Sequence, residues 1–438
     1  MSRKLLIKGG IVACPKQNLY ENMDLVIQDG VITELKKDIT DTDAEILDVK
    51  GKIVCPGLID MHSHLREPGR EDIGTIQSGS ESAAAGGFTS IACMPNTTPA
   101  IDNQMGIEYI KSRSKAVGLV NIYPIASVTK GLNGQELVEI SRVVEAGAVA
   151  LSDDDSPITD TALMRQALEY CTMFDIPIIS HCEDPFLSED GCVNEGLVST
   201  KMGFKGIPSI AEDIIVSRDI TLASYTQSKI HIAHVSTPRS IEIIRQAKAG
   251  GVRVSCEVSP NHFSLTENDV LNSHYNTNTK MYPPLRDEAS VRAIISGLQD
   301  GTIDSIATDH SPWLDTEKDI EYIHAPMGVI GFETAIPLIW TKLVATGELS
   351  PLTALAKITC EPAKILNIPG GDLLKGSPGD VTIIDPDLEL TIDHDFFHSI
   401  SHNSPFIGHT LQGFAIYTIV GGQIIFNRHT NTITRRDI

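Results

Sequence analysis

Histidines and aspartates of the types that bind metal ions recur in this sequence at the ends of short apolar segments. His62 and His64 follow the apolar run 53–59. Two histidines separated by one residue at the end of a strand point to the same side, so both rings can meet at one metal ion. A single pair of this kind is more often two ordinary polar residues, but comparable groups stand at the ends of four later apolar runs, at 152–155, 180–184, 231–236 and 308–310. This recurrence predicts a metal centre.

The side chains in these groups could bind two divalent ions close together. Ions held in this way can keep a hydroxide at neutral pH and polarise a carbonyl group. The last carboxylate, Asp309, could bind one ion, take the proton of the attacking water and deliver it to a leaving nitrogen. There is no GxSxG nucleophile elbow, and no Walker loop or Rossmann glycine run precedes a helix, which argues against serine chemistry and a nucleotide cofactor.

The elements that must position these residues alternate along the middle of the chain. Short apolar runs predict eight strands, at 53–59, 89–94, 122–126, 148–151, 176–179, 230–235, 252–258 and 303–307. Helical patterns separate many of them, as at 136–146, 161–174, 240–249 and 289–298. Eight strands alternating with helices predict an α/β fold, a (β/α)8 TIM barrel, in which function sits at the C-terminal ends of the strands.

The two ends of the chain differ from the middle, since both carry short strand-like runs broken by glycines. These runs are at 5–7, 25–27 and 31–35 near the start, and at 381–384 and 414–425 near the end. Two such ends can pair with each other, which brings the termini together. We therefore expect a small β-sandwich built from residues 1–55 and 370–438, with the metal-dependent barrel at 56–369 between them.

Composition limits the class of protein. The net charge of −22 over 438 residues argues against a nucleic-acid partner, which needs a basic surface. The sequence contains no run of 18 apolar residues, so we expect no membrane span. The first residues of the chain are charged, and their apolar part is too short for a signal peptide. The eight cysteines form no CxxC pair, and several lie in apolar runs, so we expect reduced, buried thiols in a cytoplasmic protein.

Longer segments resemble the class I dihydroorotases of the amidohydrolase superfamily over nearly the whole chain. The most specific are His-Leu-Arg-Glu-Pro-Gly at 64–69 and Met-Pro-Asn-Thr at 94–97. Further matching segments lie at 56–60, 152–154, 181–184, 234–237, 283–286, 307–310, 325–333, 379–381, 403–408 and 418–422. The resemblance implies the reversible closure of N-carbamoyl-L-aspartate to dihydroorotate, a step of pyrimidine synthesis, by a metal-held hydroxide with Asp309 as the proton shuttle.

The resemblance also implies a ligand set for the divalent metal, with zinc expected as one or two ions per subunit, although manganese and cobalt accept the same ligands. His62 and His64 would hold the more buried ion, and His181 and His234 the more exposed one. The set consists of His62, His64, Asp154, His181, His234 and Asp309.

The carboxylate at the fourth strand is one of several neighbouring aspartates. Asp154 is chosen because its spacing to His181 resembles the spacing in the family, and Asp153 is the alternative. Related cyclic amidases use a carboxylated lysine at this place. No lysine lies between Lys130 and Lys201, which favours an aspartate here.

Arg66 and Asn96 would hold the carboxylate of the substrate by resemblance. An arginine suits this role because its two parallel N–H groups match two carboxylate oxygens. The alternatives are a surface ion pair of Arg66 with Glu67 or a neighbour, and a turn role for Asn96 after Pro95.

Three positions depart from the family pattern. Tyr282 stands where asparagine is usual, Trp313 where histidine is usual, and Asp155 where glycine is usual. The first two would lie near the substrate, where a phenol hydroxyl or an indole N–H could replace part of the lost hydrogen bonding. A pocket shaped for a different ring is the other interpretation.

Two other functions remain open from the sequence. One is another cyclic amidase, of the hydantoinase, allantoinase or imide-hydrolase type; the missing lysine counts against the first two, and Arg66 with Asn96 favours an acidic substrate. The other is a non-catalytic homologue that acts as an assembly partner, although such a protein should lose ligands and this chain keeps all six. For partners we expect a small-molecule substrate and a homodimer, with association with other pyrimidine-pathway enzymes also open.

Overall fold

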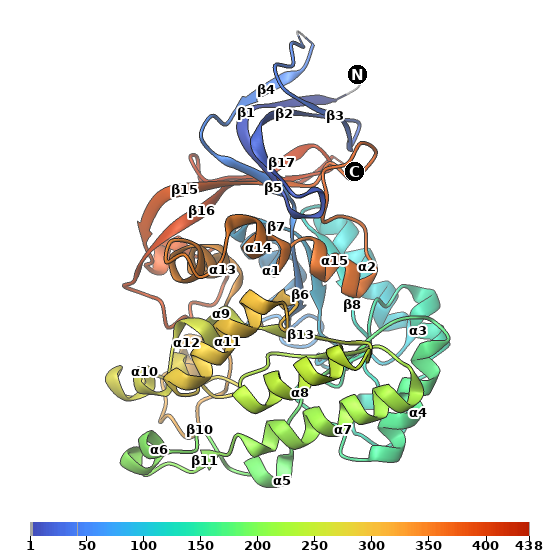
Figure 1. Cartoon of the computed structure of the whole chain (residues 1–438), viewed down its shortest axis with the longest axis vertical. Helices are drawn as coiled ribbons and strands as arrows, with labels where there is room; N and C mark the ends of the chain where they lie inside the picture. The colour runs from blue at the N-terminus through green and yellow to red at the C-terminus, as the bar shows by residue number, and fades with distance from the viewer. Residues whose placement is uncertain (1–2, 42, 438) are drawn as a thin grey trace.

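The computed structural model describes residues 3–41 and 43–437 (Figure 1). A barrel of parallel strands with helices around it occupies one end of the molecule, and a large sheet built from both ends of the chain covers the other. The described ends of the chain both lie at the sheet, as the domain-insertion pattern in the sequence predicts.

The barrel contains eight parallel strand positions, which confirms the predicted TIM barrel. Two sheets supply most of it, in the orders β6-β7-β8 and β14-β13-β12-β9. Isolated bridges join them: Leu151 pairs with Ala126 and Ile178, and Ser63 pairs with His310. The strands are β6 (Leu58–Ser63), β7 (Phe88–Cys93), β8 (Asn121–Pro124), β9 (Ile178–Ser180), β12 (Ile230–Ile232), β13 (Val254–Val258) and β14 (Ser305–Ile306).

The apolar run 53–59, expected as one strand, is two strands that belong to different sheets. β5 (Ile53–Pro56) pairs with strands of the large sheet, and β6 begins the barrel. Gly57 separates them, and a Cβ there would lie only 2.1 Å from the Thr89 hydroxyl oxygen. The expected strand boundary was therefore wrong, because an apolar run does not reveal a change of sheet, and His62 lies inside a barrel strand.

Helices surround the barrel, and polar side chains cap many of their starts. Asp160 accepts hydrogen bonds at the start of α4, and Asp287 does so at the start of α11. The expected helix 136–146 begins only at Ile140, because Leu137 instead pairs with Thr129 in a short bridge. The main helices are α1 (Ile76–Gly86), α2 (Gln104–Val117), α3 (Ile140–Ala146), α4 (Thr161–Thr172), α7 (Ile210–Thr226), α8 (Pro238–Ala249), α11 (Glu288–Asp300) and α13 (Phe332–Ile339).

Shorter elements fill the connections between strands and helices, and most of them follow the C-terminal ends of the barrel strands. They are α5 (Pro185–Ser188), β10 (Val193–Asn194), α6 (Leu197–Met202), β11 (Gly206–Ile207), α9 (Pro260–Ser264), α10 (Glu267–Asn272), α12 (Asp315–Lys318), a π-helical turn (Trp340–Val344), α14 (Pro351–Ala356) and α15 (Cys360–Leu366). Among the described helices, none is long and apolar enough to cross a bilayer.

The interior of the barrel is apolar at one end. Small and branched side chains from successive strands form one buried cluster with Ala363 and Leu366 of α15, which packs against β6. The members that lie on the barrel strands or directly beside a strand or strand bridge are Ile59, Met61, Ala92, Met94, Ile125, Ala150, Ile179, Ala233 and Ala307. Because this layer fills the barrel below, the polar residues at the C-terminal strand ends are held above a rigid floor.

The large sheet has nine strands in the order β18-β17-β16-β15-β5-β1-β2-β3, with β4 paired to β1. It confirms a small β domain made from both chain ends, whose core includes Leu25, Val54, Ile383 and Ile419. Its strands are β1 (Lys4–Cys14), β2 (Leu19–Gln28), β3 (Val31–Lys36), β4 (Glu45–Asp48), β15 (Val381–Thr391), β16 (Thr410–Val420), β17 (Gln423–Asn427) and β18 (Thr432–Ile433), besides β5. All eight cysteines of the chain are free thiols.

Candidate active site

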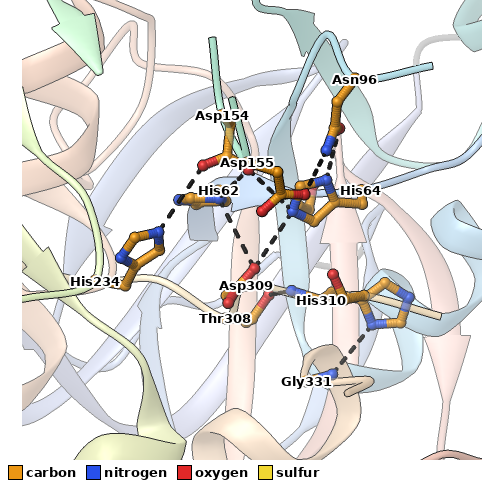
Figure 2. Close-up of polar contacts among 12 residues, drawn as sticks. His62, His64, Asn96, Asp154, Asp155, His234, Thr308, Asp309, His310 and Gly331 are labelled. Carbon is orange, nitrogen blue, oxygen red and sulfur yellow. Dashed lines mark hydrogen bonds and ion pairs between the residues drawn. The ribbon is translucent and has the colours of Figure 1, made fainter. Parts of the chain in front are cut away.

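The structure brings all six expected ligands together at the C-terminal end of the barrel, and Figure 2 labels all of them except His181. Each comes from a different place in the barrel because each follows or ends a different strand, except for the first pair, which shares β6. The residues are His62 in β6, His64 directly after β6, Asp154 after the bridge at Leu151, His181 after β9, His234 after β12 and Asp309 after β14.

Asp154 lies between two histidine pairs. Its Oδ2 atom is 3.3 Å from Nε2 of His62 and 3.4 Å from Nε2 of His64. Its Oδ1 atom is 3.8 Å from Nδ1 of His181 and 3.8 Å from Nε2 of His234. Each carboxylate oxygen of Asp154 therefore faces a different histidine pair. This one side chain could contribute a ligand atom next to each pair.

Asp309 completes the first pair from the opposite side. Its Oδ1 atom is 3.3 Å from Nε2 of His64 and 3.8 Å from Nε2 of His62, and its backbone N–H donates to the carbonyl oxygen of His62 at 3.0 Å. The preceding residue, Thr308, is fixed by two hydrogen bonds to the buried carboxylate of Asp60, at 2.7 and 2.9 Å. The strand end therefore holds the Asp309 carboxylate at the centre (Figure 2).

The donor set fits divalent metal ions. Asp154 Oδ1 is buried and has no hydrogen-bond partner among the described residues, although two imidazole nitrogens face it. Burial lowers the pKa of His181 to about 3, so this imidazole is neutral and offers a lone pair. Burial alone would raise the pKa of Asp154, but the neighbouring histidines hold it well below its ordinary value. The neutral imidazole of His181 and the ionised carboxylate of Asp154, with further imidazoles beside them, form a ligand set for zinc and similar ions.

Oxygen atoms behind the first histidine pair fix the orientation of both rings. Glu257 of β13 places Oε1 2.7 Å from Nδ1 of His62, and Asn96 places Oδ1 2.8 Å from Nδ1 of His64. Because each acceptor takes the Nδ1 hydrogen, each Nε2 atom is left to bind metal. Sequence analysis missed Glu257, although a charged residue inside the apolar run 252–258 was a visible signal.

A Glu257→Gln variant should bind the metal about tenfold to a hundredfold more weakly, since the charge that supports His62 is lost while the ligand itself remains. Competition with a chelator measures this affinity. Glu333→Gln is the matched control, because Glu333 is also a buried carboxylate but accepts hydrogen bonds from Ser82 and from the backbone at 398–399. Unchanged metal affinity in Glu257→Gln would show that this carboxylate does not tune the site.

The three neighbouring aspartates have different surroundings. Asp153, the alternative to Asp154, turns away from the centre and accepts hydrogen bonds from the backbone of Val128 at 2.7 Å and of Thr129 at 3.0 Å. Asp155 has a left-handed backbone (φ 62°) and accepts a hydrogen bond from Nδ2 of Asn96 at 2.8 Å (Figure 2). Aspartate tolerates this conformation better than most residues, which explains how it can replace glycine here.

Arg66 is a buried cation without an acidic partner. Its guanidinium donates to the carbonyl oxygen of Pro312 and to the hydroxyl of Ser311, both at 3.3 Å. Among the described residues no carboxylate oxygen lies within 4.0 Å of it, and the alternative of an ion pair with Glu67 is wrong, because Glu67 pairs with Arg113 at 2.8 Å. A buried charge of this kind costs free energy unless an anion binds to it.

The side chains of Tyr282 and Trp313 also reach the site, but both of their polar hydrogens are directed at protein oxygens. The Tyr282 hydroxyl donates to Oε1 of Glu183 at 2.6 Å, and its ring lies 4.4 Å from the ring of His181. The Trp313 indole N–H donates to the carbonyl oxygen of Met327 at 2.8 Å, and its ring lies beneath the guanidinium of Arg66.

A TIM barrel with histidines and aspartates at its C-terminal strand ends is typical of metal-dependent amidohydrolases, and solved structures share the fold of this chain. L-hydantoinase (dihydropyrimidinase) from Arthrobacter aurescens superposes with a TM-score of 0.87 at 24% identity, covering 97% of this chain and 96% of that one. Dihydropyrimidinase from Brevibacillus agri gives 0.84 at 20% identity, covering 99% and 96%. At such identities the likeness shows the fold.

Sequence comparison identifies the family within this class. A family model described as dihydro-orotase-like matches residues 51–240. The dihydroorotase of Pelotomaculum thermopropionicum is 52% identical over 96% of this chain and 98% of its own length. That of Acetivibrio thermocellus is 50% identical over 96% and 98%. The chain belongs to the dihydroorotase family and is therefore a hydrolase of cyclic amides.

Proposed function

We propose that this chain interconverts N-carbamoyl-L-aspartate and (S)-dihydroorotate plus water in pyrimidine synthesis. The observation that carries the proposal beyond the family is Arg66, a buried cation without an acidic partner two residues after a metal-type histidine. An acidic ring substrate would neutralise it, whereas a neutral hydantoin or imide would not. The full-length relatives at about 50% identity carry the dihydroorotase name, which disfavours the other cyclic amidases and an inactive assembly partner.

The six ligands would hold one or two divalent ions, with zinc expected because imidazole and carboxylate donors suit it. A bound ion lowers the pKa of a coordinated water and polarises the ring carbonyl. His62, His64 and Asp309 form one donor group, His181 and His234 form the other, and Asp154 joins them.

Asp309 moves the proton in this proposal. Although burial raises the pKa of its carboxyl, hydrogen bonding to His64 and the nearby histidines lower it below the ordinary value, so the group is ionised and can accept a proton. In hydrolysis it accepts the proton of the attacking water and gives it to the ring nitrogen as the C–N bond breaks. In ring closure the attacking nitrogen loses its proton as the C–N bond forms. This proton and the hydrogen of a protonated Asp309 together convert the departing carboxylate oxygen into water.

Arg66 orients the substrate in this proposal. Two of its N–H groups donate to Ser311 and Pro312, and the others are left for the substrate carboxylate. Asn96 would assist, and its amide is already oriented by His64 on one side and Asp155 on the other. Fixing the carboxylate would place the reacting carbonyl beside Asp309.

Purified, metal-loaded protein should consume L-dihydroorotate, measured as the loss of ultraviolet absorbance, and should leave hydantoin, allantoin and a cyclic imide unchanged. A chelator should abolish this turnover, and added divalent metal should restore it, since the ions supply the activated water. Turnover of another ring in place of dihydroorotate would refute the proposed substrate. Dihydroorotate turnover that survives complete metal removal would refute the proposed chemistry.

We also propose that residues 56–369 form the catalytic domain and that 1–55 and 370–438 form the β domain. This division is supported by β5, which leaves the large sheet at Pro56, and by β15, which re-enters it at Val381. We propose a homodimer as the assembly, because symmetric pairs are the commonest oligomers. Association with other pyrimidine-pathway enzymes is a further proposal.

A further inference from the structure

One short loop after β14 holds Arg66 from several sides. Ser311 accepts from one guanidinium nitrogen and Pro312 from another, both at 3.3 Å. Trp313 then places its ring against the guanidinium, with the central carbon 4.7 Å from the ring centroid. The same ring lies 5.9 Å from the guanidinium carbon of Arg70, which is paired with Asp72 and Glu317.

The indole ring itself is fixed in place. Its N–H donates to the carbonyl oxygen of Met327 at 2.8 Å, and the backbone N–H of Trp313 donates to Oδ1 of Asn403 at 3.2 Å. The amide of Asn403 donates in turn to the carbonyl oxygens of Ser311 and Gly328, at 2.9 and 3.3 Å. The ring is therefore a rigid platform and not a mobile surface side chain.

Arg66 needs such a platform more than most arginines do. Its backbone is left-handed (φ 66°), its side chain is only 9% exposed, and no described carboxylate lies within 4.0 Å to fix its orientation. A cation over an indole face is attracted more strongly when water is excluded. The ring covers one face of the guanidinium and leaves the edge with the remaining N–H groups for an anion.

We propose that Trp313 is a positioning residue that sets the affinity for the acidic substrate by holding the guanidinium of Arg66 in the plane that meets the substrate carboxylate. The inference rests on the proposed function for the role of Arg66. It assigns to the indole a task different from hydrogen bonding to the substrate, because its only N–H is directed at Met327.

Steady-state kinetics on L-dihydroorotate test the proposal. Trp313→Leu should raise KM about tenfold with kcat and metal content nearly unchanged, because the reacting centre is left intact. Trp313→Phe keeps a stacking ring and should recover most of the loss. In an Arg66→Lys background, which lacks the planar fork, Trp313→Leu should add little. An unchanged KM in Trp313→Leu, a loss confined to kcat, or the same factor in both backgrounds would overturn the inference.

A binding experiment tests the same inference without turnover. The chain has only two tryptophans, so Trp340→Phe leaves Trp313 as the sole indole fluorophore. In that variant N-carbamoyl-L-aspartate should change the emission saturably, and N-carbamoyl-β-alanine, which lacks the carboxylate assigned to Arg66, should not. Arg66→Lys should remove the difference. An equal response to both ligands, or no response, would overturn the inference, whereas failure of dihydroorotate turnover alone would overturn only the proposed function.

Discussion

An Asp309→Asn variant should lose about a thousandfold or more in kcat on dihydroorotate. The substitution removes the carboxylate that accepts the proton of water, and an amide cannot act as a base in its place. The carboxylate lies 3.3 Å from Nε2 of His64 and 3.8 Å from Nε2 of His62, so its loss should also weaken metal binding. The measurement is single-turnover and steady-state kinetics at saturating metal, with metal content determined on the same samples.

The control for this variant is Asp287→Asn, the same chemical change at the N-cap of α11, where asparagine caps a helix as well as aspartate does. It should keep the turnover of the unmodified chain. Full activity of Asp309→Asn at saturating metal would show that another group moves the proton. If excess metal fully restored the kcat of Asp309→Asn, Asp309 would act only as a metal ligand and not as the proton shuttle.

The clustering of the six expected ligands could be predicted from the sequence because a parallel barrel converts strand ends into spatial neighbours. Once the strands are counted, His62, Asp154 and Asp309 must meet, although they are far apart along the chain. The choice between Asp153 and Asp154 needed more than this rule. Both follow the same strand. Only the structure shows that the carboxylate of Asp153 accepts hydrogen bonds from the backbone N–H groups of Val128 and Thr129.

The side chains that hydrogen-bond to the expected ligands could not be predicted. No pattern in the sequence shows that a histidine ring nitrogen bonds to an acceptor 195 residues away. Glu257 supports His62 across that separation. The Arg66–Trp313 stack joins residues in the loops that follow two different barrel strands, and its cause is the local path of these loops. The split at Gly57 was missed for another reason: β5 and β6 are both buried and apolar, so hydropathy is the same on either side of the change of sheet.

The two neighbouring aspartates offer a sharp test of which carboxylate binds metal. Asp154→Asn should weaken metal binding more than about a hundredfold, which exceeds the effect of losing a group behind a ligand, because Asp154 addresses both histidine pairs and its Oδ1 has no other described partner. Turnover should fall in parallel. Metal analysis after dialysis against a weak chelator, with kinetics on the same protein, measures both effects.

Asp153→Asn makes the same chemical change one residue earlier and should have the opposite profile. Its carboxylate accepts two backbone hydrogen bonds and one from the Thr129 hydroxyl, so we expect a loss of about 2 kcal/mol in the free energy of unfolding. Metal content per folded chain should stay the same, because the side chain points away from the centre. Chemical denaturation with metal analysis separates the two variants. If Asp153→Asn lost the metal and Asp154→Asn kept it, the bridging role would pass to Asp153 and the donor set at the centre would have to be reassigned.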